Sequence, residues 1–470
     1  MSSLAKLSGI INHKIFRNFL VFSGFLFSLS RLIRGADNFY VIALLSLSLL
    51  LFINIKTIFS KKISIVLFWF LPFGIWTLLS SLWSLEPIIS FARGLFYIFI
   101  SSSAVLISFF YKNKLTDLFK IFLALNTLVI FITTVSLVIG IPSDAWTANH
   151  GMGFTAVFTH QNSLAAVLMF TLIGPTYYLL NACLPYSRQI ILNKSCHSGL
   201  DPESNRMLIN TGSKKDADLH QHDTGNEPDS NPKYGEMSNQ VHDDKSSNGI
   251  PKWLNWESVF FLILIVLNIL FIYLSYSRAV MLALFIGGVG LVFLLSSLKT
   301  NITFVLISII VGTSLYYFVG DDLQSYLKKG GNDYSGRRQI LWEPSYKAAV
   351  NGGLIGLGYG VTDPSIESNY KKENRLGEVK REKGNSILAL IEETGVVGLI
   401  LFFLPVFVIL KKYIIKKPSF MLSMPLLISS LLAFIVHTQF EGWMVGVSSF
   451  SLFVYLIVVT TLMYSNIEER

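Results

Sequence analysis

Long apolar runs recur along this chain, and they constrain its fold more than any other feature. Two of them, 259–275 and 279–298, approach the roughly twenty residues that cross a bilayer as a helix. Hydrophobic residues make up 52% of the chain and charged residues 14%, against about a quarter charged in a soluble domain. A chain in lipid must pair its own backbone groups, and unbroken apolar runs do this as helices. The sequence therefore predicts an all-α, polytopic membrane protein.

We expect about twelve transmembrane helices in this fold. Their approximate ranges are 15–33, 38–56, 63–83, 91–111, 117–140, 162–183, 257–276, 279–298, 302–319, 385–410, 420–438 and 444–465. Arg31 and Arg34 interrupt the first two ranges.

Lysines gather in alternate connections between these spans. The lysine-bearing connections are 56–62, 112–114, 299 and 411–417, whereas 84–87, 143–149 and 438–442 carry no Lys or Arg. Basic loops usually stay in the cytoplasm, so the lysine-bearing connections, and with them both termini, are predicted to be cytoplasmic. Arg31 and Arg34 would lie on the opposite side, but the lysines outnumber them. The net charge of +9 thus has a topological use, and nucleic-acid binding is not indicated.

Two polar stretches divide the apolar sequence. We expect helices 1–6 in 1–183, a disordered cytoplasmic insert in 184–253, helices 7–9 in 254–319, a large periplasmic loop in 320–383 and helices 10–12 in 384–470. The insert has too few apolar residues to bury a core. A regulatory tail or a histidine metal site is the alternative to an insertion tolerated in a loop, and the tolerated insertion is favoured.

Arginines at the outer boundary are the first candidates for chemistry. Arg278 follows Ser277 at the outer end of the seventh span, and Arg337 and Arg338 lie early in the large loop, close to Trp342. Such arginines can simply contact lipid headgroups or solvent. A guanidinium also suits a phosphate, and a tryptophan holds a segment at the membrane interface. The pattern is therefore compatible with a pyrophosphate site at the membrane surface.

Glycines and caps mark other positions of interest. Gly356, Gly358 and Gly360 lack the strand and helix context of a dinucleotide site, so they predict a tight turn or a close backbone approach. His160 and Asn162 open the sixth span, where they can cap the helix or face a substrate cavity.

The tenth span combines a polar start with charges inside it. Asn385 begins it, and Gly395 and Gly398 have the spacing of close helix packing. Glu392 and Glu393 lie in the same apolar stretch. Because carboxylates are costly there, at least one of them should have a partner or a role.

Together these pieces resemble the bacterial O-antigen ligase and polymerase family, from about residue 150 to the end without the insert. The residues that carry the resemblance are His160, Gln161, Asn162, Ser277, Arg278, Ser335, Gly336, Arg337, Trp342, Gly356, Gly358, Gly360, Asn385, Gly395 and Gly398. The resemblance implies a fold of the glycosyltransferase C class in the bacterial inner membrane. It also implies transfer of a glycan from undecaprenyl pyrophosphate to an acceptor hydroxyl, without a metal or other cofactor. Arg278 and Arg337 would then bind the pyrophosphate, with Arg338 auxiliary and Asn162 and Asn385 in substrate binding.

One position departs from the family pattern. Ligases of this family usually have His before the Asn, where this chain has Gly384. Glycine cannot accept a proton, so the general base must lie elsewhere. Glu382 is the first substitute, although Arg381 and Lys383 beside it should lower its pKa; His160 is the second.

The resulting hypothesis is a membrane glycosyltransferase acting at the periplasmic face. Its acceptor would be lipid A-core or a second lipid-linked glycan. The alternative is a transporter or flippase of the same lipid-linked glycans, which twelve spans would also suit. No convincing repeat relates the two halves and the polar residues cluster at the outer surface, so the enzyme is favoured.

Overall fold

The computed structural model describes residues 14–140, 153–183, 256–296, 338–366, 371–373, 379–381, 383–415, 422–446 and 449–468. The chain divides into one unit of Met1–Cys183 with Glu257–Arg470 and another of Leu184–Trp256. Apart from Trp256, the second unit lies outside the described residues, and so does the predicted disordered insert. The fold below is that of the first unit.

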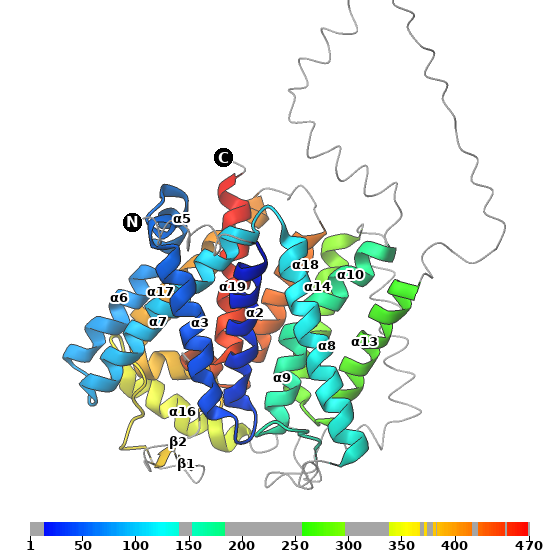
Figure 1. Cartoon of the computed structure of the whole chain (residues 1–470). Coiled ribbons are helices and arrows are strands. Elements are labelled where there is room, and N and C mark those ends of the chain that lie inside the picture. Colours follow the sequence, from blue (N-terminus) through cyan, green and yellow to red (C-terminus); the bar gives the residue numbers. More distant parts are fainter. Residues whose placement is uncertain are drawn as a thin grey trace, which may run out of the picture. The chain divides into compact units, whose positions relative to one another are not determined.

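Helices make up nearly all of the described chain (Figure 1). In its first part they are α2 Lys14–Ser28, η1 Leu29–Leu32, η2 Asp37–Phe39, α3 Tyr40–Ile53, α4 Ile55–Ile58, α5 Lys61–Leu67, α6 Leu71–Leu79, η3 Ser80–Leu82, α7 Pro87–Tyr111, α8 Leu115–Ile139, α9 Gln161–Thr171 and α10 Ile173–Cys183. Next come α13 Trp256–Leu274, α14 Arg278–Leu295, α16 Arg338–Gly352, α17 Ser386–Ile415, α18 Ser423–His437, η4 Trp443–Val445 and α19 Phe450–Glu468. One short antiparallel ribbon pairs β1 Lys371–Glu373 with β2 Val379–Arg381.

The predicted helical membrane class is confirmed. Seven described helices are long and apolar enough to cross a membrane, or eight if the bent pair Lys61–Leu67 and Leu71–Leu82 forms one span. Three shorter apolar helices, Tyr40–Ile53, Ser423–His437 and Phe450–Ser465, match three further predicted ranges. The range 302–319 lies outside the described residues, so the total of twelve stays a prediction.

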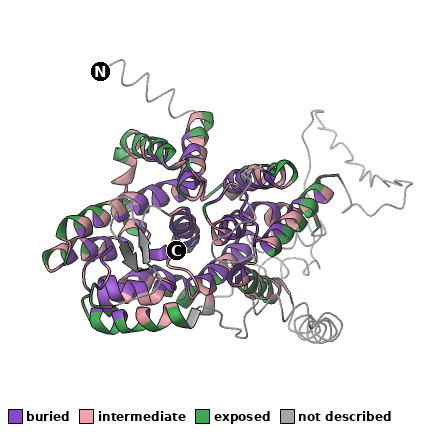
Figure 2. Ribbon diagram, turned by 90° about the horizontal axis from the view of Figure 1, so that it is seen from below, coloured by how far each residue is buried: buried purple, intermediate pink, exposed green. Residues whose placement is uncertain are grey.

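Helix α19 is the centre of the unit. Every residue from Phe450 to Tyr464 is buried, as expected of a helix that is apolar on all sides (Figure 2). Two of its threonines find a partner inside the bundle: the Ser108 hydroxyl lies 2.5 Å from that of Thr460 and accepts from that of Thr461 at 3.0 Å. The helix therefore joins the N-terminal helices to the C-terminal ones.

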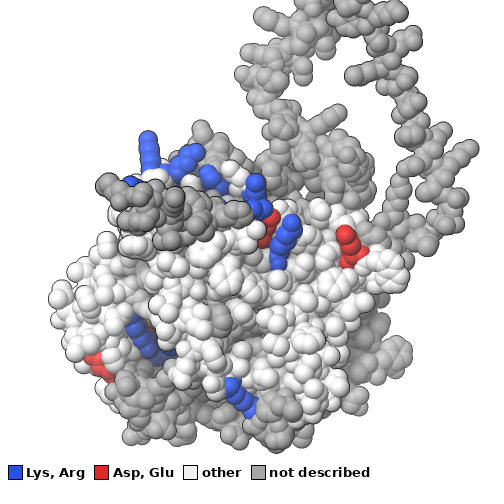
Figure 3. Space-filling model, in the orientation of Figure 1, with Lys and Arg blue, Asp and Glu red and all other residues white. Residues whose placement is uncertain are grey.

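The two ends of the helix bundle differ in charge (Figure 3). At one end, Lys14 pairs with Asp117 at 2.8 Å, near Lys112 and Lys114 between α7 and α8. We call this the lysine end. The opposite end carries η1, α16 and the start of α17, and we call it the site end. The described connections follow the predicted alternation, while 143–149, 299 and 416–417 lie outside the described residues.

The two arginines that oppose this alternation have structural partners at the site end. Arg34 donates to the carbonyl of Phe158 at 2.9 Å and to the Thr155 hydroxyl at 3.0 Å. Arg31 lies over the ring of Tyr40, 4.2 Å from its centroid. The connection between α2 and α3 is therefore fastened to the segment 153–160 that precedes α9.

Helix α17 is broken at Gly395, where φ is +72° and ψ is 179°. The loop 353–363, which we call the glycine loop, fills the break. Its Leu357 and Gly358 donate backbone N–H groups to the carbonyls of Glu392 and Glu393 at 2.9 and 3.0 Å. In return, Val396 and Val397 donate to the carbonyls of Gly353 and Leu354 at 3.1 and 3.2 Å. Backbone groups that a helix break would leave unpaired in lipid are thereby satisfied.

The predicted close approach at the three glycines is confirmed. Gly356, Gly358 and Gly360 all have positive φ, and a Cβ on any of them would collide with a neighbour. Those neighbours are the backbone of Glu393, the side chain of Ser84 and the side chain of Arg93. The expectation that Gly395 packs against another helix was wrong. Gly395 breaks its own helix and lies against the backbone of Leu354 in the glycine loop. Gly398 does lie close to another helix, at Trp76 of α6.

We predict that Gly395→Ala lowers the thermal unfolding midpoint of the protein in bilayer nanodiscs. The left-handed backbone costs an L-residue about 1–3 kcal/mol, and the new methyl group would collide with the carbonyl of Leu354. The matched control is Gly288→Ala in α14, where a Cβ meets nothing within 4 Å. Equal midpoints for the two variants would contradict the described insertion of the loop.

Candidate functional site

The start of α17 is held by Asn385, as predicted for a residue that begins this span. Its side-chain oxygen accepts from the backbone N–H groups of Ile387 and Leu388 at 2.9 and 3.0 Å. Its amide nitrogen donates to the carbonyl of Gln439 at 3.0 Å. Asn385 therefore caps the helix and joins it to the connection that follows α18.

The same connection joins Asn385 to Asn162. Glu441 accepts from the side-chain amide of Asn162 at 2.7 Å, and its backbone carbonyl accepts from the Ser386 hydroxyl at 2.5 Å. Two predicted substrate-binding residues, far apart in the sequence, are thus brought to one place by the loop between α18 and η4.

His160 is the N-cap of α9, which confirms the capping prediction. Its Nδ1 accepts from the backbone N–H of Asn162 at 3.1 Å. The lone pair on Nδ1 is therefore in use, and taking a proton there would break the cap.

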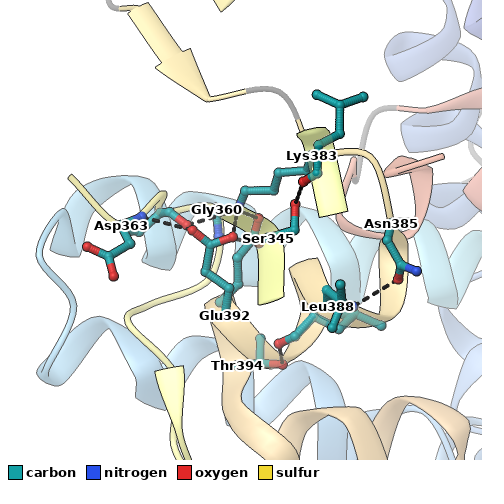
Figure 4. A network of polar contacts seen from close by, with 12 residues as sticks. Ser345, Gly360, Asp363, Lys383, Asn385, Leu388, Glu392 and Thr394 are labelled. Atoms are coloured by element: carbon teal, nitrogen blue, oxygen red, sulfur yellow. Dashed lines mark hydrogen bonds and ion pairs between the residues drawn. The ribbon is translucent and has the colours of Figure 1, made fainter. Parts of the chain in front are cut away.

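A buried group of three charges joins the residue Lys383, just before α17, to two glutamates inside that helix (Figure 4). The Lys383 ammonium is 2.5 Å from Glu393 Oε1 and 3.4 Å from Glu392 Oε2. The two carboxylates are 1% and 0% exposed and the lysine 11%. We call these residues the ion triad. The prediction that a buried glutamate in this span has a partner is confirmed for both.

The glycine loop supplies further hydrogen bonds to the triad. Gly360 donates its backbone N–H to Glu393 Oε2 at 2.6 Å, and Asp363 donates to Glu392 Oε1 at 2.9 Å. Lys383 also donates to the carbonyl of Val361 at 3.0 Å. Each carboxylate therefore has an ammonium and an N–H donor, the condition under which buried charges are tolerated.

The predicted arginines are only partly described. Arg278 begins α14 after Tyr276, whose φ is +53°, and the preceding carbonyl of Leu274 accepts from Phe154 of the segment before α9. Arg338 begins α16, and only the backbone of Arg338 is described. Arg337 and Glu382 lie outside the described residues. A meeting of Arg278 with Arg337 thus stays a prediction.

An open pocket of about 520 Å³ lies between α16, the start of α17 and the loop after α18. We call it the Trp342 pocket. Its lining residues are Trp342, Glu343, Tyr346, Asn385, Ile387, Leu388 and Gln439.

Comparison with known protein families matches residues 263–403 to the O-antigen ligase family. This match supports an O-antigen ligase-like family for the chain. The matched segment runs from α13 into α17, so it includes Arg278, α16, the glycine loop and the ion triad. Comparison with curated proteins and with solved structures gave no match.

Gly384 of this O-antigen ligase-like protein stands where the family usually has a histidine, and its surroundings show which residue that side chain would meet. A Cβ at Gly384 would lie 3.0 Å from Leu341 Cβ and 3.3 Å from Leu341 Cδ1. Leu341 of α16 thus occupies the space beside the chain at this position. A larger side chain here would have to displace it.

Sequence reasoning missed Lys383, Glu441 and Arg93 as parts of the site. Lys383 was read only as a neighbour of Glu382, whereas its charge is balanced by two glutamates of α17. The signal was present, because two carboxylates in an apolar span call for a cation nearby. Nothing local in the sequence marks Glu441, or Arg93 of α7, which packs on Gly360.

We predict that Lys383→Met destabilises the protein by about 3–5 kcal/mol, because it leaves two buried carboxylates without their cation. Adding Glu393→Gln should restore part of the loss. Thermal unfolding in nanodiscs measures both. The control is Lys347→Met, which breaks an exposed pair with Glu343 and should change stability by less than about 1 kcal/mol. A Lys383→Met protein as stable as the parent would refute the described triad.

Proposed function

We propose that this O-antigen ligase-like protein transfers a polysaccharide from an undecaprenyl-pyrophosphate carrier to an acceptor hydroxyl. The acceptor is lipid A-core or a second lipid-linked glycan. The reaction takes place at the periplasmic face of the bacterial inner membrane, and both termini are cytoplasmic. Twelve spans and a glycosyltransferase C type fold belong to the same proposal.

One observation carries this proposal. The segment that matches the O-antigen ligase family contains most of the polar cluster at the site end, and the loop at Glu441 adds Asn162 from outside it. Lys14, Lys112 and Lys114 lie at the opposite, lysine end, and under the positive-inside rule this supports a periplasmic site end. A lipid-linked glycan presented at the outer leaflet would meet this end.

In the proposed reaction, the acceptor oxygen attacks the sugar carbon that carries the diphosphate. The new glycosidic C–O bond forms, the bond to the diphosphate oxygen breaks, and the hydroxyl proton passes to a base. Negative charge grows on the leaving diphosphate, which Arg278 and Arg337 would bind, with Arg338 beside them, in place of a metal. Each well-placed donor to such a charge contributes on the order of 3 kcal/mol.

Asn162 and Asn385 take a positioning role in this proposal. Both side chains already donate hydrogen bonds to the loop that follows α18. Through them the starts of α9 and α17 are held at fixed positions around the substrate.

Glu382 is the proposed base and His160 the second candidate. The capping hydrogen bond to Nδ1 opposes proton uptake by His160. The Lys383 charge, which would have weakened a neighbouring carboxylate as a base, is already balanced by the triad.

We predict that Arg278→Ala abolishes surface polysaccharide and lets the lipid-linked precursor accumulate at the periplasmic face. Accessibility of the precursor to a membrane-impermeant glycosidase in spheroplasts measures its location. Arg31→Ala is the control, because Arg31 is an arginine of the same end that stacks on Tyr40. Accumulation of the precursor on the cytoplasmic side would contradict the transferase proposal and favour the transporter alternative.

We predict that Glu382→Gln lowers kcat by about 10²–10⁴ while the KM for the donor changes little. His160→Asn should keep most of the activity, because an asparagine oxygen can still cap α9. Transfer by the reconstituted protein is measured with each variant. Loss of turnover in His160→Asn with Glu382→Gln unaffected would reverse the assignment.

A further inference from the structure

The Trp342 pocket differs chemically from a phosphate site. Among the described residues, its lining contains no Lys, Arg or His, and one of its walls is the carboxylate of Glu343. A hydrogen bond from Lys347, at 2.9 Å, lowers the pKa of Glu343 and keeps it ionised. The Lys347 ammonium is held by this carboxylate, so the described lining offers a diphosphate no unpaired cation.

The lining also differs from that of a lipid-tail site. An acyl or prenyl chain needs only apolar walls, and among the described lining residues just Ile387 and Leu388 are aliphatic. The remaining residues are two aromatic rings, two amides and a carboxylate. Aromatic faces with amide groups at the edge suit a sugar ring, which has apolar C–H faces and a rim of hydroxyls.

Several of these polar groups retain capacity to bind a ligand. The Gln439 side chain makes only two contacts with described residues, both long at 3.4 Å, although an amide can form four hydrogen bonds. The Trp342 indole N–H is buried, so this residue offers a ligand its ring and not its N–H. Tyr346 presents its ring to the outside, 63% exposed. These groups converge on the pocket from α16 and from the loop after α18.

Size and place agree with a saccharide ligand. A pocket of about 520 Å³ falls within the range of roughly 300–1,000 Å³ that holds small organic ligands, enough for one or two sugar units. Asn385, at the wall of the pocket, caps the first turn of α17. It follows Gly384 and the triad residue Lys383 directly in the sequence. A sugar bound there would lie beside the predicted reaction centre.

We propose that the Trp342 pocket is a saccharide subsite, with Trp342 and Tyr346 stacking on the ring and Gln439 bonding its hydroxyls. The inference rests on the proposed transferase function and adds the residues that recognise sugar. The saccharide belongs either to the acceptor or to the donor glycan.

The test measures KM and kcat for both substrates in nanodiscs of phosphatidylethanolamine and phosphatidylglycerol. Glucoside and maltoside detergents must be removed, because their headgroups would compete for the site. We expect Tyr346→Ala and Gln439→Ala each to raise one KM about tenfold with little change in kcat. Tyr346→Phe, which keeps the ring, should lie close to the parent. The substrate whose KM rises identifies the source of the sugar.

Val350→Ala is the matched control, since Val350 is an exposed apolar residue of α16 outside the pocket. Unchanged KM values in Tyr346→Ala and Gln439→Ala, or a fall in kcat alone, would overturn the subsite and leave the transferase intact.

Direct binding separates the two levels of the proposal. Saturation-transfer NMR with methyl glycosides of glucose, galactose and N-acetylglucosamine should show binding that Tyr346→Ala weakens. If the parent protein transfers no glycan but binds these glycosides through the pocket, the transferase proposal fails and the subsite survives. If none of them binds and no KM moves, the subsite is wrong.

Discussion

The Lys383 ammonium, placed between two carboxylates of α17, is the interaction on which the site end depends. Charged groups inside a membrane protein persist only when they are paired and hydrogen bonded. Here the pairing also fixes a position in the chain, because Lys383 precedes Gly384 and Asn385 directly. The ammonium holds this short segment from one side, and the Asn385 cap holds it from the other. The start of α17 therefore has little freedom, as a reaction centre requires.

The broken helix and the glycine loop form one construction with this triad. Gly395 interrupts α17, and the loop supplies both the missing backbone partners and the N–H groups for the carboxylates. Residues from the N-terminal half complete it: Trp76 donates to the carbonyl of Thr394 at 2.8 Å, and Trp83 donates to that of Gly356 at 3.1 Å. The matched family segment thus depends on helices outside it for its shape.

Much of this arrangement could be predicted from residues that act locally. The length of an apolar run predicts a span, and the residues before it predict a cap, as at His160 and Asn385. The cost of a charge in lipid predicts that Glu392 and Glu393 have partners. Their partner, the loop in the helix break and the convergence on Glu441 arise from residues distant in sequence. No periodicity or spacing records such contacts, and Arg337 and Glu382 lie outside the described residues.

The change at Gly384 becomes intelligible when the sequence and the structure are considered together. In the family pattern, a histidine precedes the Asn and is the expected proton acceptor; here Leu341 of α16 packs tightly against the position where that side chain would begin. Because α16 also carries Trp342 and Tyr346, the helix that fills the histidine's place forms one wall of the pocket. The same helix thus packs against Gly384 through Leu341 and lines the pocket through Trp342 and Tyr346. A proton acceptor must then come from another residue, and Glu382, two positions earlier in the sequence, is the proposed one. Restoring a histidine at this position would require Leu341 to shift or to be replaced by a smaller residue, because a Cβ there already lies 3.0 Å from the Leu341 side chain.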